Sequence, residues 1–124
     1  MAAGIYNFTI EQGTTFIRVF NYKDSNGNPI DLSDGGVELR MQIRETIDSP
    51  DPIVGGTFTD ESGFTISTPV GTPSASQFTL VIPATTSSAY TFSRAVYDIE
   101  LVNNNVTTRL LQGKIKLSKE VTRT

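Results

Sequence analysis

The stretch from Tyr97 to Gly113 limits what this chain can fold into, because apolar and polar residues alternate on both sides of an Asn cluster. Alternation with a period of two is typical of strands that bury one face. Asparagine tolerates the backbone angles of tight turns, so the three asparagines at 103–105 mark the point where the chain reverses. The stretch therefore predicts a β-hairpin.

A two-residue turn at Asn103 and Asn104 sets the register that we expect for this hairpin. In this register the apolar side chains share one inner face, and Asp98 lies opposite Arg109 on the other face. A slip of one residue would place Arg109 opposite Ile99, so the hydrophobic pattern disfavours it. The predicted pairs are Tyr97 with Leu110, Asp98 with Arg109, Ile99 with Thr108, and Leu101 with Val106.

The second strand of the hairpin is expected to change phase, because Leu110 and Ile115 are both apolar but have opposite parity. Gly113 lies between them and is the predicted site of a β-bulge. The change of phase places Val96 across from Leu111 on the outer face, where a sheet exposed to water would carry polar residues. The candidate contact residues for a partner protein are therefore Val96, Leu111, Arg109 and Asp98.

The same alternation predicts further strands. The segment from Val37 to Arg44 is the clearest, because every second residue is apolar and the others are charged or polar. The run from Thr14 to Tyr22 is apolar on both faces apart from Arg18, so we expect it to lie centrally in a sheet. The remaining predicted strands are Ile5–Ile10, Thr57–Thr59, Phe64–Thr68 and Gln77–Ile82, and the middle two are expected to form a hairpin.

Between these strands the sequence predicts turns and one short helix. Pro83 begins a Ser- and Thr-rich run to Tyr90 that favours a helical turn, and Thr46–Gly56 is expected to be a surface loop. Lys23–Pro29 contains Asn-Gly, a strong turn signal. Its neighbourhood is rich in oxygen donors, but the glycine spacing differs from that of a calcium loop, so we prefer a turn. These donors are Asp24, Asn26, Asn28 and Asp31.

Length and composition favour a single all-β domain over residues 1–124, with eleven aromatic residues (seven Phe and four Tyr). The chain has no Cys, which excludes disulfides, thiolate metal ligands and a Cys nucleophile. The first residues lack the basic and apolar regions of a signal peptide, and no segment is long and apolar enough to span a bilayer. We therefore expect a soluble protein that is not exported by the usual signal.

The net charge of −3 and the pI of 4.8 argue against a nucleic-acid binder, which must neutralise several phosphates. An acidic run and a basic run are separated in the sequence. We expect two solvated surfaces, with a contact between complementary patches of two subunits as the alternative. The acidic run holds Glu45, Asp48, Asp51, Asp60 and Glu61, and the basic run holds Arg109, Lys114, Lys116, Lys119 and Arg123 against Glu120.

Two groups of residues suggest catalysis, and neither is convincing. The Ser and Thr cluster after Pro83 cannot form a Ser-His pair, because the chain contains no His. Asp98 and Glu100 have the spacing of a carboxylate pair on one strand face, as in a glycosidase. Opposite Arg109 and Thr107, they are better explained as a charged surface ladder. We expect no enzymatic activity and no cofactor.

Several short motifs, taken in order, resemble small structural proteins of tailed bacteriophages. The similarity is to tail or baseplate proteins of cyanophage-like phages and, more distantly, to the N-terminal domain of upper-baseplate proteins. It runs nearly end to end and departs at Asp34-Gly35-Gly36-Val37, where relatives tend to have one Gly and an aromatic residue. The motifs are Gly13–Phe16, Asp24–Leu32, Leu39–Arg44, Ile82–Ala84, Tyr97–Leu101, Arg109–Gly113 and Glu120–Arg123.

The resemblance implies an immunoglobulin-like antiparallel β-sandwich with at most one short helical turn. It implies a virion protein, assembled in the cytoplasm of the bacterial host, that contacts other tail or baseplate proteins or its own copies, without nucleic acid or membrane. Because the chain ends soon after this similarity, we expect a stand-alone subunit. The alternative is a carbohydrate-binding module, which needs exposed aromatic rings. The candidate rings are Tyr90, Phe92 and Tyr22.

Overall fold

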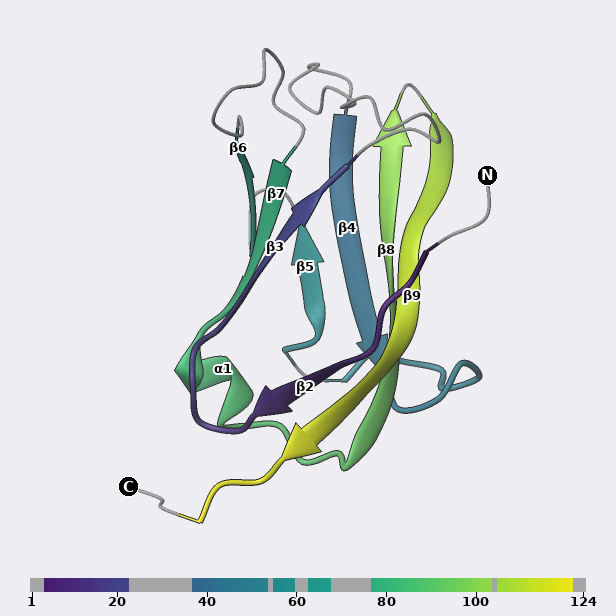
Figure 1. Cartoon of the computed structure of the whole chain (residues 1–124). Helices are drawn as coiled ribbons and strands as arrows, with labels where there is room; N and C mark the ends of the chain where they lie inside the picture. The colour runs from purple at the N-terminus through teal and green to yellow at the C-terminus, as the bar shows by residue number, and fades with distance from the viewer. Residues whose placement is uncertain are drawn as a thin grey trace.

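The computed structural model describes residues 4–22, 37–53, 55–59, 63–67, 77–103 and 105–121. Two β-sheets lie face to face, with one short helix at an end of the sandwich (Figure 1). No helix in the described ranges has the length and apolarity needed to cross a membrane. The elements are β1 (Gly4–Ile5), β2 (Phe8–Glu11), β3 (Phe16–Asn21), β4 (Val37–Arg44), β5 (Thr57–Thr59), β6 (Phe64–Ser67), β7 (Gln77–Ile82), α1 (Ala84–Ser87), β8 (Arg94–Asn103) and β9 (Val106–Ser118).

The strand order identifies the fold. The larger sheet has the order β1-β9-β8-β4-β5, with β2 also paired to β9, and the smaller sheet has the order β3-β7-β6. In immunoglobulin letters, β3, β4, β6, β7, β8 and β9 take the places of strands B, C, D, E, F and G, and β5 takes that of C′. The predicted all-β, immunoglobulin-like sandwich with one helical turn is therefore confirmed. Among the paired strands of the described ranges, β1 and β2 depart from antiparallel pairing, because both run parallel to β9.

Alternating apolar residues build the core between the sheets. Met41 and Ile43 of β4 face Leu80 and Ile82 of β7, and all four side chains are almost completely buried. Burial of this apolar surface is the main force that holds the sheets together. Both strands have the bounds predicted from their period-two pattern, Val37–Arg44 and Gln77–Ile82.

Aromatic packing links the sheets where immunoglobulin domains of antibodies carry a disulfide between strands B and F. The chain has no Cys. Instead, the Phe8 ring stacks on Phe16 of β3 with 4.9 Å between centroids, and it lies 5.0 Å from the Tyr97 ring of β8. Such ring pairs add to the burial term through their preferred geometry. Phe8 thus joins β3 to β8 without a covalent bond.

The helical turn α1 and the residues after it connect β7 to β8 and are held by hydrogen bonds to distant segments. The Ser87 hydroxyl is buried, donates to the Thr14 carbonyl at 2.8 Å and accepts the Gly13 N–H at 3.1 Å. The Tyr90 hydroxyl donates to the Gly55 carbonyl at 2.8 Å. The helical turn after Pro83 is as predicted, and its buried serine is used for hydrogen bonds within the fold.

Three predictions about strand placement are wrong. The run from Thr14 to Tyr22 forms β3, which is an edge strand and not a central one, because the N-terminal segment pairs with β9 and β7 is the only described strand that pairs with β3. That N-terminal segment is two strands rather than one, interrupted at residues 6 and 7. Finally, β5 and β6 belong to different sheets and do not form a hairpin. The predicted turn at Lys23–Pro29 and the oxygen donors at 24–31 lie outside the described residues, as do Asp60, Glu61 and Arg123.

The hairpin of β8 and β9 exists as predicted, but its register is two residues away from the predicted one. Asn103 pairs directly with Val106, so the chain reverses between these two residues, and Asn105 has a φ of 70°. A shift of two keeps every side chain on its face, so the hydrophobic pattern could not detect it. Val106, expected inside, is 64% exposed. Near the turn the pairs are Asn103 with Val106, Leu101 with Thr108, and Glu100 with Arg109.

The change of phase in β9 is real, but it occurs at Leu110 and not at Gly113. The register shifts between Ile99 and Glu100, so that Ile99 pairs with Leu111 and Leu110 is the extra residue. As a result Leu111 lies on the inner side and packs against the core. Val96 pairs with Lys114. The predicted outer pair of Val96 and Leu111 is therefore wrong.

Candidate interaction face

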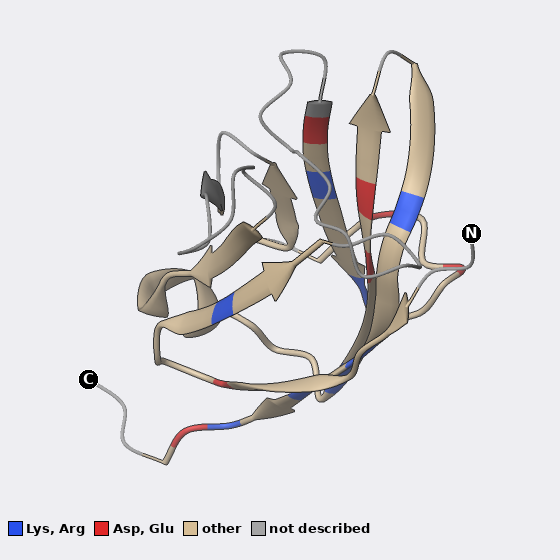
Figure 2. Cartoon of the chain, turned by 45° about the horizontal axis from the view of Figure 1, so that its top comes forward, with Lys and Arg blue, Asp and Glu red and all other residues tan. Residues whose placement is uncertain are grey.

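The side of β4, β8 and β9 that points away from the smaller sheet carries most of the sequence-predicted contact residues. We call it the outer face. Its side chains lie in rows across the three strands, because directly paired residues share a face. The rows are Arg44–Val96–Lys114, Gln42–Asp98–Gln112 and Arg40–Glu100–Arg109. Figure 2 shows charged residues spread over these strands and few on the smaller sheet.

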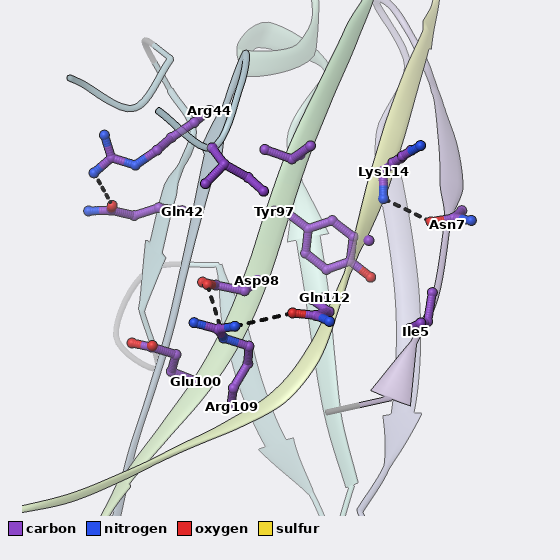
Figure 3. Close-up of a pocket in the computed structure, with 13 residues that line it drawn as sticks. Ile5, Asn7, Gln42, Arg44, Tyr97, Asp98, Glu100, Arg109, Gln112 and Lys114 are labelled. Carbon is purple, nitrogen blue, oxygen red and sulfur yellow. Dashed lines mark hydrogen bonds and ion pairs between the residues drawn. The ribbon is translucent and has the colours of Figure 1, made fainter. Parts of the chain in front are cut away.

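A hollow of about 690 Å³ lies on the outer face (Figure 3). Val96 and Asp98 are among the residues that line it. Two exposed isoleucines line it, Ile5 from β1 and Ile47 from the loop after β4, with 75% and 82% of their surface accessible. Exposed apolar side chains that line one hollow together with polar groups are a feature of protein contact sites.

The acids of the hollow are neutralised within the sheet. Arg40 Nε donates to Glu100 Oε1 at 2.9 Å. Arg109 Nε lies 3.4 Å from Asp98 Oδ2, and its Nη1 donates to Gln112 Oε1 at 3.2 Å. Figure 3 shows the Arg109 guanidinium between these two partners. Asp98 and Arg109 thus interact diagonally, not as the directly opposed pair that we predicted.

Partial burial raises the pKa of the Asp98 carboxyl above its usual range, and the nearby Glu100 carboxylate raises it further. Arg109, and to a smaller extent Arg40 and Arg44, act in the opposite direction. The charges therefore form a structural ladder in which desolvation is the largest effect on Asp98. Since each acid faces an arginine, we interpret Asp98 and Glu100 as members of this ladder.

Two cations of the hollow have no carboxylate partner among the described residues. Arg44 donates to the Ser49 carbonyl at 2.8 Å and to the Gln42 side chain at 2.9 Å. The exposed Lys114 donates its backbone N–H to Asn7 Oδ1 at 2.8 Å, and its side-chain ammonium group takes no part in this bond. These cations lie on either side of Val96, one row away from Asp98.

A second hollow of about 460 Å³ adjoins the first and is more basic. Arg94 and Lys116 line it and pair directly across β8 and β9, where like charges repel. Lys114 lines both hollows, and Glu45 is the one acid of this rim. Thus one residue of the acidic run lies close to the basic run. This end of the outer face is cationic in a chain whose net charge is −3.

The outer face brings together three of the four candidate contact residues. Val96, Asp98 and Arg109 all line the first hollow, whereas Leu111 points into the sandwich. Sequence reasoning missed Ile5 and Ile47. A signal existed for Ile47, since it is an isolated apolar residue between Thr46 and Asp48 in a polar loop. For Ile5 there was none, because its strand could equally have buried it.

The aromatic residues suggested for a sugar site are poorly placed. Tyr90 and Phe92 are only 2% and 3% exposed, because their rings pack together in the core with centroids 5.3 Å apart. Tyr22 is half-buried and packs against the core. The expectation that Tyr90 or Phe92 is available as a stacking platform is therefore wrong. Within the described ranges, no group of three or more acidic, His or Cys side chains could hold a metal ion.

Comparison with known proteins gives no assignment. No protein-family model matches the sequence, and no curated protein matches it. A solved structure with some similarity is the extracellular fragment, including the stalk region, of novel immune-type receptor 11 from Ictalurus punctatus. It is 12% identical, with a TM-score of 0.37, over 100% of this chain and 90% of that chain. A similarity of this size carries no inference, so the fold assignment rests on the strand order.

Proposed function

We propose that this protein is a non-catalytic structural subunit of a phage tail or baseplate and acts through protein–protein contacts in the virion. The resemblance of its ordered motifs to such proteins gives the class. The observation that carries the proposal is the first hollow, where exposed Ile5 and Ile47 lie beside unneutralised Arg44 and Lys114. A hollow lined by both exposed apolar and charged side chains is a candidate for protein contacts.

The charges of the outer face indicate what kind of partner surface it fits. Arg94, Lys114 and Lys116 gather at one end with a single acid, Glu45, so an acidic protein surface would relieve the repulsion between them. The other end is internally paired through Glu100 and Asp98. We therefore propose that the contact buries the apolar hollow and places acids of the partner over its basic end.

Native mass spectrometry of the purified chain, alone and mixed with tail and baseplate proteins, tests this function. We expect a defined homo-oligomer or a complex with one virion protein. Charge reversal by Arg44→Glu together with Lys114→Glu should abolish that species. Lys119→Glu is the matched control, because Lys119 is exposed and lines neither hollow. A chain that stays monomeric with every virion protein would contradict the proposal.

Carbohydrate binding remains the alternative proposal. Amide, carboxylate and guanidinium groups of Gln42, Asp98 and Arg109 in the hollow could bind hydroxyls. With Tyr90 and Phe92 buried, however, the hollow offers isoleucines in place of aromatic rings. Titration with host-surface glycans should therefore give no shift of the signals of these three residues, and saturable shifts there would favour the alternative.

A further inference from the structure

The open edge of β3 carries an inference that is independent of the outer face. In the described chain β3 pairs with β7 alone, so the backbone groups along its other edge have no strand partner (Figure 1). β3 spans six residues without Gly or Pro, and Arg18 is its one charged residue. Natural edge strands are usually protected by Pro, bulges or charged side chains, and on β3 only Arg18 is such a device, because the strand has no Pro and pairs with β7 in a regular register.

The surface beside this edge is apolar. Ile17 and Val19 point outward from β3 and are 58% and 49% exposed. Across the ladder Ile17 pairs with Val81, and Val19 pairs with Thr79. β-branched residues in such rows pack well against a further strand. Outward side chains of an added strand would therefore continue the apolar rows of β3 and β7.

Arg18 indicates what such a strand must carry. Its side chain points to the inner side of β3, and its guanidinium carbon lies 5.0 Å from the Phe16 ring centroid and 6.0 Å from that of Tyr6. Arg18 Nε is buried and has no hydrogen-bond partner among the residues that the structure describes. Its cross-strand neighbour on β7 is Leu80, which cannot accept a hydrogen bond. A buried donor without an acceptor costs free energy, so a partner that supplies one is favoured.

The same molecule shows how a strand neighbour satisfies an arginine of this kind. Arg40 of β4 pairs with Glu100 of β8, and Arg40 Nε donates to Glu100 Oε1 at 2.9 Å. Arg18 points to the inner side of its sheet, whereas Arg40 lies on the outer face, so Arg40 illustrates only the geometry of a bond between an arginine and its direct cross-strand neighbour. A glutamate directly opposite Arg18 on an added strand would share its face and could make the same bond.

A second copy of β3 does not fit this edge. Pairing β3 with another β3 brings a second Arg18 into the same inner row and supplies no carboxylate. An inward charge on an edge strand is a known barrier to pairing between like edges. Arg18 therefore selects against its own copy and in favour of an acidic strand.

We propose that the free edge of β3 is an acceptor site for an extended segment of another polypeptide, which pairs with β3 and places a carboxylate on Arg18. Backbone hydrogen bonds along residues 16–21 supply binding that is independent of sequence. The ion pair at Arg18 supplies the specificity. The site lies on the opposite sheet from the outer face, so the protein can engage two neighbours at once.

The test uses the whole chain, labelled for NMR, and two blocked peptides, Thr-Val-Thr-Glu-Thr-Val-Thr and the same peptide with Gln in place of Glu. The peptides are symmetric, so either strand direction puts the central residue opposite Arg18. We expect the Glu peptide to shift the amide signals of residues 16–21 and the Nε–H signal of Arg18, and to bind about tenfold more tightly than the Gln peptide. Arg18→Gln should remove the difference between the peptides.

The two peptides decide the question without any variant. Equal affinity for both would overturn the role of Arg18, and the absence of shifts in residues 16–21 would overturn the acceptor site. Shifts of these residues that depend on protein concentration alone would identify a second copy as the occupant and overturn the acidic strand. Ile17→Lys should weaken binding of both peptides equally, because Ile17 belongs to the outward row. None of these results depends on the outer face.

Discussion

Gly113 lies directly against the carbonyl of Tyr6, so that a methyl group at position 113 would overlap this oxygen. The same carbonyl accepts the hydroxyl of Tyr97, and the Tyr6 N–H donates to the Gln112 carbonyl at 3.0 Å. Tyr6, between β1 and β2, thus packs against β9 at Gly113, where no side chain larger than that of glycine fits. This contact explains Gly113, which is not the site of the bulge.

Replacing Gly113 with Ala should lower the free energy of unfolding by roughly 1–3 kcal/mol, because the backbone of Tyr6 must move to accept the methyl group. Denaturant unfolding measures the change. Gly4→Ala is the matched control, since its methyl group would meet a side-chain atom of Leu111 at 3.1 Å, and that atom can move. Equal losses for the two variants would contradict the close contact at Tyr6.

Alkaline pH should weaken the fold through two buried tyrosines. Burial raises the pKa of Tyr90 from 10.0 to about 12, and it raises the pKa of Tyr97 as well. The folded protein therefore keeps phenol protons that the unfolded chain releases, so stability falls as the pH rises from 10.0 through about 12. Tyr90→Phe should flatten this fall. At neutral pH the same variant should cost about 1 kcal/mol, because the bond to the Gly55 carbonyl is lost. An unchanged slope above pH 10.0 would contradict the burial of Tyr90.

Asp98→Asn should stabilise the protein at neutral pH. Burial raises the pKa of Asp98 above its ordinary 3.8, so the folded protein holds the proton of this acid more tightly than the unfolded chain does. The free energy of unfolding therefore falls as the pH rises from 3.8 through the raised pKa of the folded protein. The asparagine removes that charge at the expense of a half-exposed ion pair with Arg109, which contributes little. Thermal unfolding at neutral pH and below pH 3.8 should show a gain in the first condition only. Glu100→Gln, which loses its bond to Arg40, should give no gain.

Engineered cysteines can report the hairpin register, because the chain has no Cys of its own. Val102 and Thr107 are direct partners, whereas Glu100 and Thr107 are diagonal. Direct partners in an antiparallel pair lie about 4.5–5.5 Å apart at Cα, which suits a disulfide, and diagonal ones lie about 7–8 Å apart. The pair Val102→Cys and Thr107→Cys should oxidise readily, and the pair Glu100→Cys and Thr107→Cys should not. The reverse result would restore the register predicted from the sequence.

The sequence predicted those strands in which one face is apolar throughout. Val37–Arg44 and Gln77–Ile82 have the predicted bounds because a change of phase in either would expose several core residues. The hairpin register failed for a related reason. A shift of two residues preserves every face, and either pair of the three asparagines could form the turn, so the pattern left both registers open.

Errors of placement arose where pairing partners are distant in sequence. The apolar faces of Thr14–Tyr22 suggested a central strand, but β3 is an edge because β2 pairs with β9. Local residues contain no signal for that choice. The candidate contact set failed at Leu111 because the bulge falls at Leu110, three residues before the glycine that seemed to require it. The pattern limited the phase change to a range and could not fix its position within that range.

Labelling of lysine side chains in the isolated and the assembled protein tests the proposed contact most directly. Lys114 and Lys116 line the basic end of the outer face, and Lys119 is exposed but lines neither hollow. If the outer face is the assembly contact, Lys114 and Lys116 should react more slowly in the assembled particle while Lys119 reacts at its original rate. Protection of Lys119 alone, or unchanged rates at all three lysines, would contradict the account.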